Sequence, residues 1–294
     1  MLKMLIKRNV KLFFKDKGMF LTSLITPVIL LVLYTTFLGN VYRDAFVSGL
    51  PEGMQLPKKL LDGLVGGQLI SSLLAVSCVT VAFCSNFLMV QDKALGTIKD
   101  LRISPVKTAT LSLSYYIASL ISTLLICLTA TGLCCGYLAV IGWYLSVRDV
   151  LCLLLDVVLV VLFGTALSSV INLFLSSQGQ ISAVGTIVSS GYGFICGAYM
   201  PISSFSPGLQ KVISFLPGTY GTALMRNHAM QGALSEMAKY GVPVKEMKDA
   251  MDCNLYFFGK QVHIPGMYAI VAGTIVVLIV VYILLNKLEN KKSR

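Results

Sequence analysis

Six long apolar runs alternate with shorter polar segments along the chain. They lie at about 19–39, 64–90, 110–137, 150–175, 181–200 and 266–286. A helix needs about 20 apolar residues to cross a hydrocarbon layer about 30 Å thick. The pattern therefore predicts an all-α integral membrane protein with six transmembrane helices, in which residues 1–294 form a single transmembrane domain. Six spans would place both termini on the same side.

The composition agrees with this interpretation. Of the 294 residues, 56% are hydrophobic and 13% are charged, and the mean hydropathy is +0.80. In a soluble domain about a quarter of the residues are charged. The net charge of +11 would indicate nucleic acid in a soluble protein. In a membrane protein an excess of Lys and Arg is a topology signal, so we expect no nucleic-acid partner.

The distribution of Lys and Arg predicts the orientation. Residues 1–18, 91–107 and 287–294 contain more of them than the segments around 40–63, 138–149 and 201–265, although the first set is about half as long. Both termini are therefore expected in the cytoplasm, with the chain as a multi-pass protein of the cell membrane. The first run is too long for the apolar core of a signal peptide, and no small-residue cleavage site follows it. We expect it to be retained.

The first 18 residues predict an amphipathic helix. Lys3, Lys7, Lys11 and Lys15 recur at every fourth position, and the apolar residues lie away from that line. A basic amphipathic helix is expected to lie on the inner leaflet. The alternative is a plain positive flank of the first span.

Residues 91–107 interrupt the apolar pattern with a short charged segment. Leu95, Ile98 and Leu101 recur in steps of three among the charges, and Gly96 is expected to end or kink a helix. Ser104 and Pro105 have the residue types of an N-cap and a first helical position for the third span. The segment predicts a short cytoplasmic helix that could dock a partner.

Two stretches resemble the type-2 ABC transporter permeases. The first, "DKALGTIKDLRISPV", is similar to the coupling-helix segment of that family at Asp92, Gly96, Thr97, Leu101, Ser104, Pro105 and Val106. Ala94 departs from the pattern, because the family often has an acidic residue there. The second, "GAYMPISSFSPGLQKVISFLPGTYGTALMR", is similar to the stretch after the family's fifth span at Pro201, Pro207, Leu209, Pro217, Tyr220 and Arg226.

The resemblance implies a permease chain that pairs with a second copy or a sister permease. Each permease would dock a separate nucleotide-binding ATPase through the coupling helix and the N-terminal helix. The sequence contains no G-x-x-x-x-G-K-[ST] motif, so ATP and Mg are expected on the ATPase, with no cofactor and no catalytic site in this chain. The residues assigned to ATPase coupling are Asp92, Gly96, Thr97, Asp100, Leu101, Ser104 and Pro105.

Small residues recur on one face of two spans. In the second span they are Gln68, Ser71, Ala75, Cys78, Ala82 and Ser85, and in the fifth span Gly185, Ser189, Gly193 and Gly197. Small residues let helices approach closely in a membrane, so both faces predict helix packing. The resemblance adds that these faces border the dimer seam or the translocation path. The two interpretations are compatible.

Asp156 is the one charged residue inside a predicted span, which makes it a possible intramembrane polar site. Its place near the outer end of the helix leaves solvation by headgroups or water as the alternative. His228 and His263 are expected to be isolated surface residues, with no metal site. The eight cysteines contain no CxxC pair and are expected to be small buried hydrophobes, with Cys253 alone in a polar segment.

The segment 201–265 is too apolar for a free outer loop. Ser206 and Pro207 predict the start of one helix, Pro217 its end, and residues of about 218–232 a second helix. The resemblance implies short helices that close the exit, with Pro201, Pro207 and Pro217 as outer-gate residues. The alternative is a cap with no gating role.

These features predict the permease of an ATP-driven exporter. One Trp and mostly apolar faces favour an amphipathic or hydrophobic substrate such as a drug, antibiotic, peptide or lipid. Export of a lipid-linked polysaccharide is the alternative within the class. An intramembrane enzyme or an ion-driven carrier would need several charged residues in the spans, where we find one.

Overall fold

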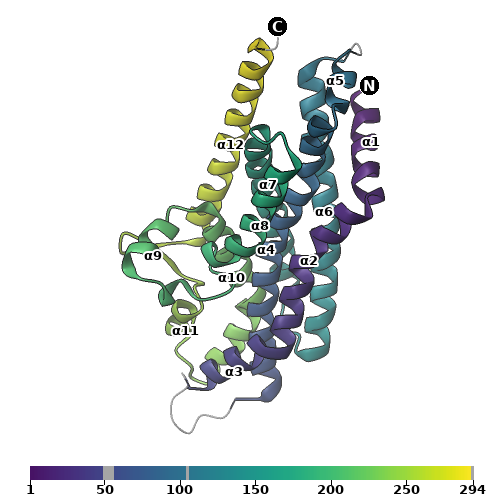
Figure 1. The fold of residues 1–294 in the computed structure, drawn as a ribbon. Coiled ribbons are helices and arrows are strands. Elements are labelled where there is room, and N and C mark those ends of the chain that lie inside the picture. Colours follow the sequence, from purple (N-terminus) through teal and green to yellow (C-terminus); the bar gives the residue numbers. More distant parts are fainter. Residues whose placement is uncertain (49–55, 104–105, 293–294) are drawn as a thin grey trace.

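The computed structural model describes residues 1–48, 56–103 and 106–292, which form long, roughly aligned helices (Figure 1). The helices are α1 (Leu2–Lys15), α2 (Lys17–Leu33), a π-helical turn (Tyr34–Leu38), α3 (Gly39–Ser48), α4 (Lys58–Ala94), α5 (Thr97–Ile103), α6 (Thr108–Ile141), α7 (Val147–Leu173), α8 (Gln178–Ile195), a 3-10 turn (Ile202–Ser204), α9 (Pro207–Ile213), α10 (Pro217–Ala238), α11 (Val244–Ala250) and α12 (Ile264–Lys292). Two short strands, β1 (Leu255–Phe257) and β2 (Lys260–Val262), pair antiparallel.

Five helices in the described part of the chain are long and apolar enough to span a membrane. They are Lys17–Asp44, α4, α6, α7 and Ile264–Leu288 within α12. This confirms the all-α membrane fold, apart from the small hairpin. The predicted fifth span corresponds to α8, whose 18 residues reach about 27 Å. Because α8 is not one of the five, the count of six spans stays a prediction.

Helix α4 is the centre of the bundle. It packs against α2, α6, α7, α8 and α10, and 94% of its most apolar window is buried, against 17–50% in the other four spans. A helix that is apolar around its whole circumference is expected to be enclosed by others. At 37 residues, α4 is about 55 Å long, so it extends well beyond a hydrocarbon layer of about 30 Å.

The N-terminal helix is amphipathic, as predicted. Leu5, Asn9 and Phe13 are buried on one face of α1, which packs against α6, and the four lysines of the periodic line are exposed. Asp16 then accepts a hydrogen bond from the Met19 amide at 3.0 Å and caps α2. The position of α1 relative to a lipid leaflet stays a prediction.

Helix α6 begins later than the sequence pattern predicts. Its first residue is Thr108, and the extended Lys107 is its N-cap. The predicted start at Ser104 and Pro105 falls on residues that lie outside the described part of the chain. Capping boxes start the next two helices, with Ser146 and Asp149 at α7 and Ser177 and Gln180 at α8.

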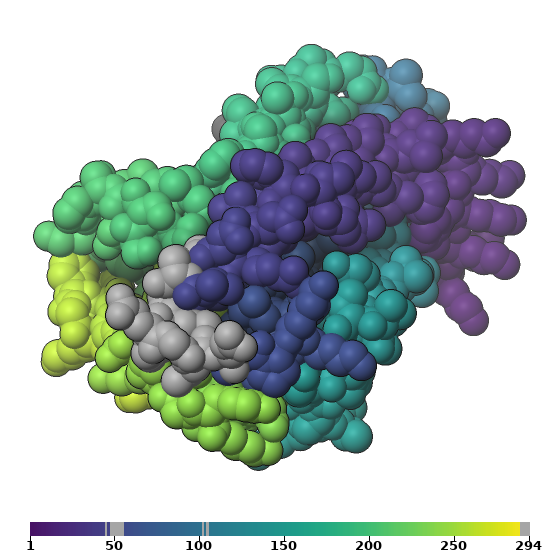
Figure 2. Space-filling view, turned by 90° about the horizontal axis from the view of Figure 1, so that it is seen from below, coloured from purple at the N-terminus to yellow at the C-terminus, as the bar shows by residue number. Residues whose placement is uncertain are grey.

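Both termini and α5 lie at one end of the bundle, and α3 lies at the other end (Figure 1). Residues 201–263 spread along one side of the bundle, as the view from the α3 end shows (Figure 2). This segment, which we call the cap, contains α9, α10, α11 and the hairpin. Helix α10 has 22 residues and is mostly buried, so the second cap helix is longer than predicted. Pro217 is its first residue, and α9 already ends at Ile213.

Candidate functional site

Helix α5 stands between the two longest spans, α4 and α6. It follows Gly96, whose φ of +79° is in the left-handed region that favours glycine. Ile98 is buried and anchors α5 to the core. Leu95 and Ile103 are 75% and 85% exposed. The segment thus combines a fixed position with exposed apolar side chains.

The other residues predicted for coupling fall into two groups. Lys99 and Asp100 are exposed, and Thr97 is half-buried at the start of α5. Leu101 packs partly against the hydrophobic core. The sequence spacing placed Leu101 at the docking face, whereas the structure exposes Ile103 there. Steps of three residues do not distinguish these positions, because α5 has only two turns.

Asp92 is used inside the chain. Its carboxylate is buried, accepts a hydrogen bond from Tyr115 Oη at 2.5 Å and pairs with Arg8 Nη1 at 3.0 Å. Asn9 on α1 also donates to Ser114 Oγ on α6 at 3.3 Å. Asp92 therefore holds α1 against α4 and α6, beside α5. Arg8 and Tyr115 are partners that the motif alone did not reveal.

The small-residue face of the second predicted span packs within the subunit. Gln68, Ser71, Cys78 and Ser85 are all buried. Ser85 Oγ lies 2.6 Å from Ser119 Oγ and 2.9 Å from Thr123 Oγ1, which joins α4 to α6. In this conformation these side chains hold helices of one chain together. Their assignment to a translocation path stays a prediction.

A groove of about 550 Å³ lies between α2, α4 and α8. Two residues of the fifth-span stripe, Gly185 and Ser189, line it. Its other walls mix hydroxyl groups with aromatic rings, from Thr22, Thr26, Thr80, Phe83 and Phe87 among others. The groove can therefore accommodate a molecule with both polar and apolar parts.

The fifth-span stripe does not continue as one helix face. Gly193 lies against the ring of Tyr199, which folds back over α8. Gly197 follows the helix, with φ +73°. The amides of Gly197 and Ala198 bond back to Phe194 and Gly193 at 3.2 and 2.9 Å. This is a Schellman end. Gly197 therefore ends α8, which corrects its prediction as a helix-packing position.

We expect Gly193→Ala to destabilise the protein by about 1–3 kcal/mol, because a Cβ there overlaps the Tyr199 ring. Gly191→Ala is the matched control in the same helix, since no atom lies within 4 Å of its added Cβ. Thermal unfolding of the purified variants measures the difference. In a Tyr199→Ala background, which lacks the overlapping ring, Gly193→Ala is expected to cost little. Equal melting temperatures for the two single variants would contradict this packing.

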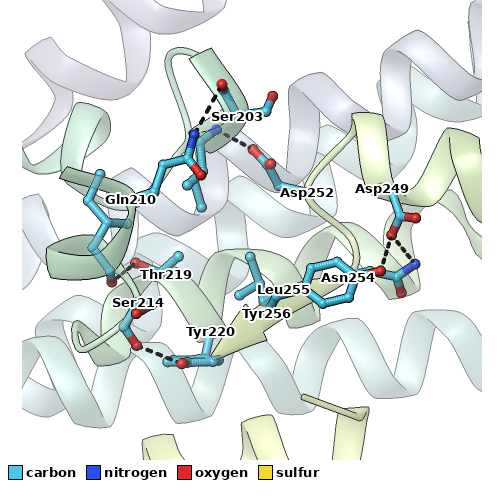
Figure 3. Close-up of a pocket in the computed structure, with 12 residues that line it drawn as sticks. Ser203, Gln210, Ser214, Thr219, Tyr220, Asp249, Asp252, Asn254, Leu255 and Tyr256 are labelled. Atoms are coloured by element: carbon cyan, nitrogen blue, oxygen red, sulfur yellow. Dashed lines mark hydrogen bonds between the residues drawn. The ribbon is translucent and has the colours of Figure 1, made fainter. Parts of the chain in front are cut away.

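The three predicted outer-gate prolines organise the cap. Pro201 is the N-cap of the 3-10 turn, and Pro207 and Pro217 are the first residues of α9 and α10. Their part in gating stays a prediction. A pocket of about 240 Å³ lies between these elements, and Figure 3 shows the residues that line it. Asp249 accepts hydrogen bonds there from Asn254 and Tyr256, at 2.8 and 2.9 Å.

Arg226 joins the cap to the bundle. Its buried guanidinium donates to the carbonyls of Met251 and Gly197, both at 2.8 Å, and lies 3.6 Å from Asp252. Asp252 also accepts from the Ile202 amide at 2.7 Å. Burial raises the pKa of the Asp252 carboxyl, and the Arg226 charge opposes that rise. Four chain segments therefore meet at one ion pair.

Asp156 is fully buried and has two partners. His228 Nδ1 on α10 and Tyr268 Oη on α12 each lie 2.5 Å from one of its carboxylate oxygens. His228 is not an isolated surface residue, so that prediction is wrong, whereas His263 is exposed as expected. The partners are separated from Asp156 by 72 and 112 positions, and no local pattern connects them. Cys253 is also buried, despite its polar flanks.

The structure combines a bundle of long apolar helices, an anchored α5 and a groove between α2, α4 and α8. Residues 1–230 match the family model of the ABC-2 type transporter. No curated protein matches the chain significantly. The matched range contains α1, the α5 segment and all predicted spans except the last. The chain belongs to the ABC-2 type transporter family, and it is a membrane-spanning permease of an ABC transporter, a class that works with a partner ATPase.

Proposed function

We propose that the chain is the permease of an ATP-driven exporter in the cytoplasmic membrane, with both termini inside. A separate nucleotide-binding ATPase would bind ATP and Mg. The observation that supports this best is α5 itself. It is held by Ile98, exposes Leu95 and Ile103, and lies at the same end as both termini (Figure 1). An exposed apolar pair among charges is typical of a protein contact.

Motion of the ATPase would reach the bundle through α5. The helix is joined directly to α4 and α6, and the Arg8, Asp92 and Tyr115 contacts attach α1 to the same two helices. Lys93 Nζ also donates to the Leu173 carbonyl at the end of α7, at 2.9 Å. A displacement of α5 would therefore move several spans as a unit.

We further propose that two permease chains pair and that the α2, α4 and α8 groove is part of the substrate path. A volume of about 550 Å³ falls within the range of pockets for drug-sized molecules, roughly 300–1,000 Å³. Its mixed lining favours an amphipathic drug, antibiotic, peptide or lipid. A polysaccharide chain would require a longer polar route. In this scheme, the cap prolines would support the exit gate.

Ile103→Asp is expected to uncouple the permease from its ATPase. Loss of an apolar contact and burial of a charge in the interface should weaken the complex at least roughly tenfold. Co-purification of the ATPase and ATP-driven export measure the effect at equal membrane abundance. Phe258→Asp is the matched control, because Phe258 is 68% exposed on the hairpin, away from α5. Wild-type export and ATPase recovery in Ile103→Asp would exclude α5 as the docking element.

Leu101→Asp is a less selective variant. Leu101 packs partly against the core, so a charge there perturbs the fold of α5 as well as any docking contact. Comparing its membrane abundance with that of Ile103→Asp separates these two effects.

A further inference from the structure

A second pocket, of about 270 Å³, lies between α3, α4 and α11, away from the α5 end (Figure 1). It is lined by Tyr42, Phe46, Gln68, Pro201, Glu246 and two methionines, Met247 and Met251, among others. The α2, α4 and α8 groove shares none of these residues. The pocket is therefore a separate site, on the side where the cap meets α4.

Gln68 places an unsatisfied acceptor in this pocket. Its side chain is 3% exposed, and its Oε1 atom has no hydrogen-bond partner among the described residues. Buried side-chain oxygens are nearly always paired, and leaving one unpaired is unfavourable. A ligand with an N–H or O–H donor would satisfy this oxygen.

The walls of the pocket favour a cation that carries apolar groups. Tyr42 and Phe46 stack with ring centroids 6.4 Å apart and planes at 28°, and Met247 and Met251 add polarizable thioethers. Aromatic faces attract ammonium groups, and thioethers adapt to varied apolar shapes.

The one charged residue among those that line the pocket is the exposed Glu246, whereas Lys245 and Lys248 on the same helix α11 do not line it. The nearest buried cation, Arg226, is already paired with Asp252 at 3.6 Å. A carboxylate at the entrance attracts a cationic ligand and repels an anionic one.

We propose that this pocket binds a small protonated amphipathic amine, with its N–H group on Gln68 Oε1, its apolar part against Tyr42 and Phe46, and Glu246 supplying the opposite charge. The ammonium could belong to a transported amine or to the headgroup of phosphatidylethanolamine. The inference rests on the proposed export of amphipathic substrates in one respect only, the role of this site in the transport cycle. Binding itself requires no ATP.

The test uses the full chain in nanodiscs of phosphatidylcholine and phosphatidylglycerol, titrated calorimetrically with 1-naphthylmethylamine. Gln68→Leu is expected to raise the Kd about tenfold, because it removes a hydrogen bond to a charged donor. Glu246→Gln is expected to raise it about threefold, since the carboxylate is exposed and screened. Glu236→Gln, an acidic residue paired with Lys239 on α10, is the matched control and should leave the Kd unchanged.

A second ligand and a second lipid complete the test. The N,N,N-trimethyl analogue has the same rings and charge but no N–H, so it should bind wild type weakly and lose nothing in Gln68→Leu. Competition by added phosphatidylethanolamine would assign the site to the lipid, and its absence to a soluble amine. A Kd within twofold of wild type in both Gln68→Leu and Glu246→Gln would overturn the proposal. If the chain binds the amine but shows no ATP-driven export, the proposed function is wrong and the proposed binding site stands.

Discussion

Arg226→Met is expected to loosen the contacts of α10 with the residues after α11 and with the end of α8, with a loss of about 3–5 kcal/mol. The substitution removes two hydrogen bonds to carbonyl groups and leaves Asp252 buried without its cation. Because Met keeps the length and apolar character of the arginine stem, the effect reports the lost charge and hydrogen bonds rather than a cavity.

Cys253 provides the measurement. It is buried beside this ion pair, and burial raises the pKa of its thiol to about 12. In a variant with the other seven cysteines replaced by Ala, a thiol reagent should modify Cys253 slowly. Arg226→Met should raise the labelling rate by roughly 100-fold or more, as the opening free energy falls.

The loss of stability in Arg226→Met should depend on pH in a definite direction. Burial gives Asp252 a higher pKa in the folded chain than in the unfolded chain. The folded state then binds more protons, so stability falls as pH rises between the two pKa values. Removing Arg226 raises the pKa of Asp252 in the folded chain further, so stability continues to fall up to a higher pH. Arg226→Met should therefore be most impaired at pH 8 and partly restored at pH 5.

Two controls define the cause. Arg226→Met combined with Asp252→Asn removes the unpaired charge and keeps an oxygen for the Ile202 amide, so it should recover much of the loss. Lys239→Met breaks only an exposed pair with Glu236 and should cost less than about 1 kcal/mol. Slow labelling of Cys253 in Arg226→Met, with no pH dependence beyond that of thiolate formation in an unfolded reference, would contradict a structural role for the ion pair.

The sequence predicted the helices well, because hydrophobic run length is a local property. It could not rank their burial. Helix α4 was expected to show one small-residue face, but it is enclosed on all sides. Its polar side chains bond to both α6 and α7, Ser85 to Ser119 and Asn86 to Ser168. Periodicity identifies a face. It does not show how many neighbours surround a helix.

The candidate site was predictable in position but not in its contacts. The motif placed Asp92 and Leu101 at the coupling segment, yet Asp92 turns inward to Arg8, and Ile103 takes the exposed position. A seven-residue helix gives too few turns for spacing to fix its orientation. Asp156 and His228 lie 72 positions apart. Their pairing depends on the packing of α7 against α10, which no local pattern contains.

Asp156→Ala is expected to destabilise the contact of α7 with α10 and α12 by about 3–5 kcal/mol. The carboxyl group is 0% exposed, accepts from Tyr268 Oη and is hydrogen-bonded to His228 Nδ1. Its removal leaves both partners unpaired. Asp149→Ala is the matched control on the same helix, because it removes an exposed capping box worth about 0.5–2 kcal/mol. Thermal unfolding and membrane abundance measure both variants.

A double-mutant cycle shows whether the buried acid acts through its partners. Tyr268→Phe removes one donor while keeping the ring, so in the Asp156→Ala background it should cost less than in the wild type, by about 0.5–3 kcal/mol. His228→Gln should behave in the same way. Additive losses would mean that the three side chains do not form one unit. Asp156→Asn then separates structure from transport, because the amide can still accept from Tyr268. Normal abundance with lost export would assign the charge to transport, and retained export would leave it as the tie between three helices.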